Sequence, residues 1–334
     1  MNVPMLSPDE KRRLAIRIIA ESTTSLVSSL ADIAGPETAI EVMRSYFEHA
    51  GRAAAAGLKR LAPTLPGDDI TMIQLILLQT NHCFSDRGTR NAWVSDEVAS
   101  CEVVDCTYSG GCPELCTMIC DDGSNGVCRF INPAYEMRML EMQTKGSPGC
   151  YWVVRRKGSP VTAVDPSQRR RLEPLMGEEE MRAFQMQYLG EFWVLATRGF
   201  LDVVEERAAF RVIEPCRRLM GLRLGLSLKP AVIQGAGGLV SASHLVRLVG
   251  ECLGQEYMDL REEEGGFSWR VRSCPFADAP EGLCRQVAGM NRGVCMAVNP
   301  RYEFTMMRGG EGGEGCLYRV HESAPSRLDR LWAL

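Results

Sequence analysis

The stretch from Asp105 to Cys150, DCTYSGGCPELCTMICDDGSNGVCRFINPAYEMRMLEMQTKGSPGC, decides the fold. It contains six of the 14 cysteines of the chain. A similar stretch with fewer cysteines, SCPFADAPEGLCRQVAGMNRGVCMAVNPRYEFTMMRGGEGGEGC, runs from Ser273 to Cys316. Both stretches carry an Asn-Pro-x-Tyr-Glu motif and close on Gly-x-x-Gly-Cys. This ordered recurrence predicts a tandem duplication.

Four pairs of cysteines align between the two stretches, at an offset that falls from 168 to 166 residues. The pairs are Cys106 with Cys274, Cys116 with Cys284, Cys128 with Cys295, and Cys150 with Cys316. We therefore predict repeat one at 1–157, a linker at 158–176 and repeat two at 177–334. Domains of this size are common. Repeat one, the richer in cysteine, is the copy that we expect to be active.

Composition narrows the class of protein. Of the 334 residues, 45% are hydrophobic and 24% are charged, with a net charge of −4. There is no basic excess of the kind that marks a nucleic-acid-binding protein. No secretory signal or membrane-spanning run is evident, which predicts a cytoplasmic protein with no membrane partner. In a reducing cytoplasm, many cysteines indicate metal or catalytic chemistry rather than disulfides. A homo-oligomer or an accessory subunit of a larger complex is compatible with this composition.

Hydrophobic periodicity predicts helices at 10–34, 37–61 and 69–84. The chain then predicts short strands near 93–94 and 102–104, and a hairpin of 135–143 with 151–155. Repeat two is expected to begin with helices at 177–198, 214–228 and 239–253. Helices followed by a small antiparallel sheet that carries the cysteines predict an α+β fold for each repeat.

Repeat one carries a row of thiols next to carboxylates. Cys112, Cys116 and Cys120 are spaced four apart, so a helix places their sulfur atoms on one face. Asp121 and Asp122 follow directly, and the glycines that come next predict a turn at 123–126. A helix N-terminus favours the thiolate and nearby carboxylates disfavour it, so Cys112 is the best activated of the three and Cys120 the worst. Asp122 is our candidate base.

The residues 113–122, preceded by Cys106 and followed by Gly149-Cys150-Tyr-Trp152, resemble the L-2-amino-thiazoline-4-carboxylic acid hydrolase family. That family carries a leading cysteine, a Cys-x-x-x-Cys-x-x-Asp-like run and a closing Gly-x-x-Cys-x-Phe. Here Asp122 comes one residue early and Trp152 replaces the final Phe. The helix segment 46–52 and the closing Gly146 to Cys150 also resemble, more weakly, 4-vinyl-reductase-type sensor domains.

The first resemblance implies a hydrolase that opens a small cyclic amidine and yields an N-carbamoyl thiol product. We therefore predict an enzyme that acts on a C–N bond of a small amidine- or thiazoline-like substrate. Cys112, Cys116, Cys120 and Asp122 are the predicted catalytic residues. In repeat two the positions of Cys112, Cys120 and Asp122 hold Pro280, Ala288 and Met290, so that copy is expected to be degenerate.

A non-catalytic module that binds a metal or a small molecule is the alternative hypothesis. The cofactor is unknown, and zinc or an iron–sulfur cluster are its candidates. The predicted ligands are the cysteines that both repeats share: Cys106, Cys116, Cys128, Cys150, Cys274, Cys284, Cys295 and Cys316. Their spacing lacks the close pairs typical of structural zinc sites, which counts against this hypothesis.

Overall fold

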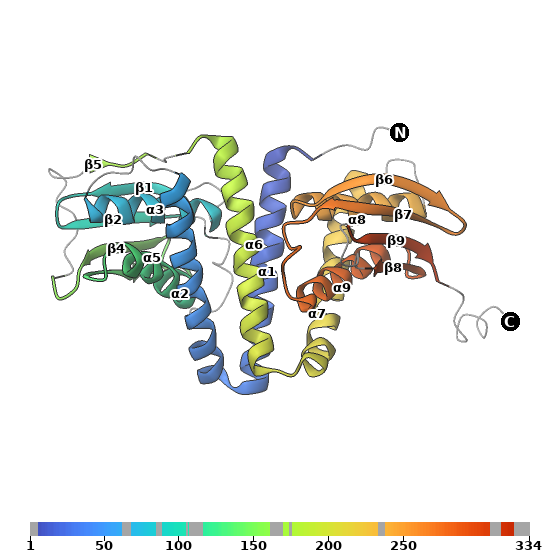
Figure 1. Ribbon diagram of the computed structural model, residues 1–334, viewed down its shortest axis with the longest axis horizontal. Coiled ribbons are helices and arrows are strands. Elements are labelled where there is room, and N and C mark those ends of the chain that lie inside the picture. The colour runs from blue at the N-terminus through green and yellow to red at the C-terminus, as the bar shows by residue number, and fades with distance from the viewer. Residues whose placement is uncertain are drawn as a thin grey trace. The chain divides into compact units, whose positions relative to one another are not determined.

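The computed structural model describes residues 6–61, 68–84, 89–104, 106, 116–160, 170–173, 176–232, 238–307 and 315–323. The chain divides into two compact units (Figure 1). We call Ile16–Val203 the N-terminal unit, and Met1–Ala15 together with Val204–Leu334 the C-terminal unit. Each unit combines helices with one antiparallel sheet, which confirms the predicted α+β class.

The helices of the N-terminal unit begin and end at the residues that the sequence marks. Most of α1 (Pro8–Ala34) belongs to this unit, and the helix ends before Gly35, whose φ of +89° favours glycine. Helix α2 (Pro36–Leu61) starts on a proline, which a first helical turn tolerates. In α3 (Asp69–Phe84), the Asp68 carboxylate accepts a hydrogen bond of 2.8 Å from the Thr71 N–H and caps the helix.

The sheet of the N-terminal unit has five antiparallel strands in the order β3-β4-β2-β1-β5. Their bounds are β1 (Thr89–Val94), β2 (Val98–Val103), β3 (Tyr135–Glu141), β4 (Cys150–Arg156) and β5 (Arg170–Arg171). The predicted hairpin is confirmed, because β3 pairs with β4. Strand β5 comes from the predicted linker and pairs with β1. Between the two hairpins lie a π-helical turn, η1 (Met118–Asp122), and α5 (Gly123–Ile131).

The C-terminal unit has the same order of elements along the chain. Its helices are α7 (Glu206–Val232), α8 (Leu239–Cys252) and α9 (Glu281–Val298). Its strands are β6 (Glu256–Glu263), β7 (Gly266–Ser273), β8 (Tyr302–Met307) and β9 (Leu317–Glu322). They form the sheet β8-β9-β7-β6, which has the order of β3-β4-β2-β1. Figure 1 shows α2, α3 and α5 with the first sheet, and α7, α8 and α9 with the second.

Glycines let a long helix and a shorter one touch backbone to backbone in each unit. A Cβ atom at Gly51 of α2 would lie 1.8 Å from the carbonyl oxygen of Gly123, and one at Gly126 would lie 2.2 Å from that of Glu48. In the C-terminal unit, a Cβ atom at Gly221 would lie 1.9 Å from the Met290 carbonyl oxygen. Each of these glycines therefore allows an approach that a larger residue would block.

Two sequence-based expectations are corrected. Residues 123–126 form the first turn of α5 and not a loop, because their glycines serve the contact with α2. Helix α6 (Glu178–Val203), which we assigned to the second repeat, packs in the N-terminal unit, where Phe192 stacks on Phe47 at 5.2 Å between ring centroids.

One helix of the described residues, α1, is long and apolar enough to cross a membrane. Of its most apolar 18-residue window, 56% is buried inside the protein. Core helices of soluble proteins have the same properties, so this helix is weak support for a membrane span. The cytoplasmic location therefore stays a prediction.

Candidate functional site

A row of hydrogen-bonded thiols lies between the π-helical turn and β4 of the N-terminal unit. The backbone N–H of Gln143 donates to Cys150 Sγ at 3.4 Å. The Cys150 thiol hydrogen-bonds to Cys116, and the Cys116 thiol hydrogen-bonds to Cys120. Cys106 lies within electrostatic range of Cys120. Four of the sequence-selected cysteines therefore gather in one place.

Gln143 holds the two ends of this cluster together. Its side-chain oxygen accepts a hydrogen bond of 3.1 Å from the Cys106 N–H. Its side-chain nitrogen donates to the Val104 carbonyl at 2.6 Å. The side-chain amide of Gln143 thus binds Val104, which follows β2, and Cys106, while its backbone N–H binds Cys150 at the start of β4. Sequence reasoning missed Gln143, which had no motif to single it out.

The thiols of this row are held in the protonated form. The hydrogen bond to Cys120 and burial together raise the pKa of Cys116 to about 12, although the bond from Cys150 lowers it. The bond to Cys116 and burial raise the pKa of Cys150 far above its usual range. For Cys120 the bond from Cys116 lowers the pKa, but burial and the neighbouring Cys106, Cys150 and Asp121 raise it more. The site therefore does not provide a thiolate at neutral pH.

Asp121 is the carboxyl whose environment suits acid–base chemistry. Burial raises the pKa of Asp121 to about 6, a hydrogen bond from the Met139 N–H lowers it, and the charge of Asp122 raises it further. A carboxyl that titrates near neutrality can exchange protons at physiological pH. The sequence analysis favoured the neighbouring Asp122, which lies one residue before the position of the aspartate in the family motif. Burial raises the pKa of both carboxyls, and the ion pair of Asp122 with Arg44, which the sequence does not state, distinguishes them.

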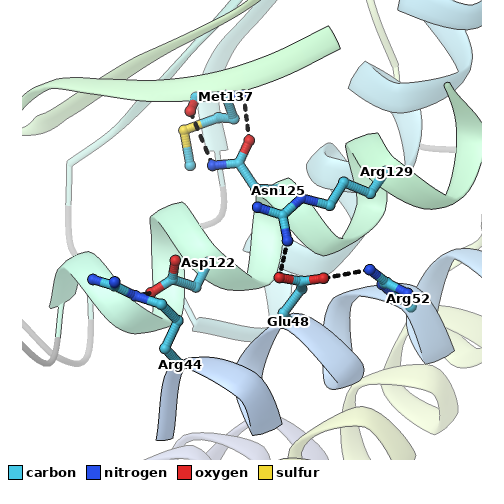
Figure 2. A network of polar contacts seen from close by, with 7 residues as sticks. All are labelled: Arg44, Glu48, Arg52, Asp122, Asn125, Arg129 and Met137. Atoms are coloured by element: carbon cyan, nitrogen blue, oxygen red, sulfur yellow. Dashed lines mark hydrogen bonds and ion pairs between the residues drawn. The ribbon is translucent and has the colours of Figure 1, made fainter. Parts of the chain in front are cut away.

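Asp122 takes part in a polar network between α2 and α5 (Figure 2). Its carboxylate forms an ion pair of 3.1 Å with Arg44. Burial raises the pKa of Asp122, and Arg44 acts against that increase. One turn further along α2, Glu48 pairs with both Arg52 and Arg129, as Figure 2 shows. These ion pairs fix the end of the π-helical turn to α2.

Asn125 fixes the start of α5 to the sheet. Its side-chain oxygen accepts from the Met137 N–H at 2.9 Å, and its side-chain nitrogen donates to the Met137 carbonyl at 3.1 Å (Figure 2). Both hydrogen-bonding groups of one β3 residue are thereby satisfied by one amide. The helix that carries the candidate site is held on β3 by Asn125 and on α2 by the ion pairs.

The π-helical turn accommodates one extra residue. Twelve residues separate Cys116 from Cys128, whereas eleven separate Cys284 from Cys295 on the uninterrupted helix α9. A π-type hydrogen bond spans five residues where an α-type bond spans four, so one such turn takes up one additional residue. Cys120, Asp121 and Asp122 all lie in this turn. π-helical turns of this kind often occur at functional sites.

Cys120 opens onto a cavity of about 10 Å³, roughly the size of one water molecule. The wall includes Thr80 of α3, Ser124 of α5 and Tyr188 of α6. Unlike Cys116 and Cys150, which are buried, Cys120 is partly exposed. It is the member of the row that a water molecule can reach.

The structure does not bring all of the predicted metal ligands together. Cys128 lies twelve residues beyond Cys116 on a continuous helical segment, roughly 18 Å away along its axis. Cys284 and Cys295 are separated by eleven residues of α9, roughly 16 Å. One metal ion cannot bind both members of either pair. Among the described residues, no group of three or more His, Cys, Asp or Glu side chains has a geometry that could hold a metal ion.

Other predicted site residues fall in two places. Cys112, which we predicted to be the best-activated thiol, lies outside the described residues. Cys274, Cys284 and Cys316 of the C-terminal unit all line one cavity of about 210 Å³. Cys128 and Cys295 are buried in their helices, and burial raises the pKa of both thiols, to about 12 for Cys128.

No family model, no curated protein and no solved structure matches this chain. The hydrolase resemblance therefore stays a prediction.

Proposed function

We propose that the N-terminal unit is a hydrolase for a C–N bond of a small cyclic amidine or thiazoline-like substrate. The observation that carries this proposal is the Asp121 carboxyl, whose pKa is about 6, within electrostatic range of the partly exposed Cys120. A buried carboxyl tuned toward neutrality, beside a reachable polar group, is characteristic of acid–base sites.

Asp121 acts as the general base in this proposal. Near pH 7 most of its carboxyl groups are ionised, yet they remain basic enough to accept a proton. The carboxylate takes a proton from water as the water oxygen bonds to the amidine carbon. Asp121 then returns that proton to the ring nitrogen, the bond between this nitrogen and the carbon breaks, and the carbon becomes a carbonyl. Water supplies the oxygen and both protons of the products.

The protonated thiols bind the substrate rather than attack it. Because the pKa of Cys120 is raised, its sulfur is neutral at pH 7 and offers a weak S–H donor and a polarisable surface. Cys116 and Cys150 hold it in place through the hydrogen-bonded row. Asp122, paired with Arg44, is a positioning residue in this proposal and not the base.

A matched pair of aspartate variants tests the assignment. We expect the wild-type protein to turn over 2-amino-thiazoline-4-carboxylic acid, with the amine that cleavage of the ring C–N bond releases measured by an amine-reactive dye. Asp121→Asn should lower kcat by about 100-fold or more, the usual contribution of a general base. Asp122→Asn should lower it by less than about 10-fold, because it removes an ion pair and no proton acceptor.

Two results would contradict the proposal. Full activity in Asp121→Asn would show that Asp121 is not the general base. The proposed hydrolase activity would be excluded if the wild type turned over neither this substrate nor cyclic amidines such as 2-aminoimidazoline.

We also propose that the two units descend from one duplicated ancestor. The shared strand order, the paired cysteines and the glycine contacts at Gly51 and Gly221 support this. The helix α9 lacks the extra residue, and Ala288 replaces Cys120. The C-terminal unit is then a copy without the acid–base group.

Binding of a small molecule without turnover is the second candidate function. The cavity beside Cys274, Cys284 and Cys316 favours it, because it is far larger than the one at Cys120. A hydrolase in one unit and a binding site in the other are compatible with each other.

A further inference from the structure

The cavity of about 210 Å³ in the C-terminal unit lies between α9 and the sheet. Its wall includes Cys274, Phe276, Cys284, Cys316, Tyr318 and Gln255. The remaining wall is apolar apart from Arg272, whose side chain is exposed. An apolar cavity of about 150 Å³ is large enough for benzene, so this one accommodates a single ring with a substituent.

The Gln255 amide is committed to the protein on both sides. Its nitrogen donates to the Tyr318 hydroxyl at 3.0 Å, and its oxygen accepts from the Tyr257 hydroxyl at 2.8 Å. Gly250 leaves the space for this arrangement, because a Cβ atom there would lie 1.4 Å from the Tyr257 hydroxyl oxygen. Gln255 therefore orients Tyr318 and has no further group for a ligand.

Tyr318 keeps a hydrogen-bond donor for the cavity. The tyrosine is 2% exposed, and its oxygen is the acceptor in the bond from Gln255. Within the part of the chain that the structure describes, no protein group accepts a hydrogen bond from the Tyr318 O–H. A buried donor without an acceptor costs free energy, so a bound molecule that supplies one gains affinity.

We propose that this cavity binds a compact, uncharged ring compound that offers one hydrogen-bond acceptor, such as a carbonyl oxygen, to the Tyr318 hydroxyl. The apolar wall disfavours an ionised ligand, since the described lining provides no buried charge to compensate it. The three sulfur atoms add polarisable contacts for the ring. This site is in the other unit from the hydrolase site and does not depend on it.

Two probes of nearly equal shape test the hydrogen bond. Acetophenone carries a carbonyl acceptor and ethylbenzene does not, and ligand-detected NMR titration measures the affinity of each. We expect acetophenone to bind about 5- to 10-fold more tightly, the effect of one neutral hydrogen bond. Tyr318→Phe should remove this preference and leave the affinity for ethylbenzene unchanged. Trp152→Phe in the N-terminal unit is the matched aromatic control and should leave both affinities unchanged.

A second measurement uses the wild-type chain alone. Acetophenone should slow the alkylation of Cys274 and Cys316 by N-ethylmaleimide, because both line the cavity. It should leave Cys216 unaffected, because this exposed cysteine is not part of the wall. Equal affinity of the two probes, binding of neither, a preference that persists in Tyr318→Phe, or unchanged alkylation of Cys274 and Cys316 would each overturn the proposal.

Discussion

The two units differ most where their cysteines meet. In the N-terminal unit, Cys116 and Cys150 are buried and hydrogen-bonded in a row that ends at Cys120, beside two aspartates. In the C-terminal unit, Cys274 and Cys316 are partly exposed and open into a cavity. The order of strands is the same in both sheets. One fold thus carries either a closed thiol–carboxyl site or an open cavity, depending on a few residues of one helix.

The π-helical turn accounts for much of this difference. Cys120, Asp121 and Asp122 all lie in this turn, and α5 follows it directly. The uninterrupted α9 has Ala288, Gly289 and Met290 in the corresponding region. The extra residue in the helix therefore leaves the order of the strands unchanged.

The largest expected effect comes from the glycine contacts that the two units share. Gly51→Ala and Gly221→Ala should each destabilise their unit by about 3 kcal/mol, because the added Cβ meets a backbone carbonyl that cannot rotate away. Gly57→Ala, in the same helix as Gly51, has nothing within 4 Å and should be neutral or stabilising by up to about 1 kcal/mol. Chemical denaturation followed by circular dichroism measures all three. If Gly51→Ala destabilised the protein and Gly221→Ala did not, the two units would not share the same helix–helix contact.

The second-largest expected difference between the two units is the reactivity of their thiols. The pKa of Cys116 is raised to about 12 from 9.0, so its thiolate is scarce at pH 7. We expect N-ethylmaleimide to label Cys116 and Cys150 in the folded protein roughly 100-fold more slowly than Cys274 and Cys316, which are partly exposed. Mass spectrometry of peptides after timed labelling gives each rate. Equal rates would show that the closed thiol row opens readily in solution.

Asp121 should give the N-terminal unit a distinctive pH dependence. Its folded-state pKa of about 6 exceeds the ordinary 3.8, so the folded state binds the proton more tightly. Stability from this group is present below about pH 4 and falls as the pH rises through about 6, by about 2 kcal/mol. Asp121→Asn should remove this decrease and be more stable than the wild type at pH 7. Denaturation midpoints at pH 4 and pH 7 provide the test, and identical pH profiles would contradict the raised pKa.

The sequence was sufficient for the three helices that precede the first sheet. Helix α3 has the predicted bounds, because its capping aspartate and apolar period are local signals. The packing of α6 with the N-terminal unit was not predictable, since it depends on long-range contacts such as that of Phe192 with Phe47. The preference for Asp121 over Asp122 in our proposal likewise depends on the packing around the two carboxyls and on the ion pair of Asp122 with Arg44, which no local pattern reveals. The shift in offset between the cysteine pairs was the one sequence signal of the π-helical turn.

The smallest expected effect concerns the ion pair at the end of that turn. Arg44 is 55% exposed on its side chain and lies 3.1 Å from Asp122, so water screens the pair. Arg44→Ala should cost less than about 1 kcal/mol, and 1 M NaCl should weaken the wild type by a similar amount. The C-terminal unit joins α7 to α9 with a different pair, Glu214 with Arg292 at 2.6 Å, and Glu214→Ala should have an equally small effect. Denaturation in low and high salt measures both. A loss above about 2 kcal/mol in either variant would mean that ion pairs, and not the glycine contacts, hold these helices together, because only a pair shielded from water has that strength.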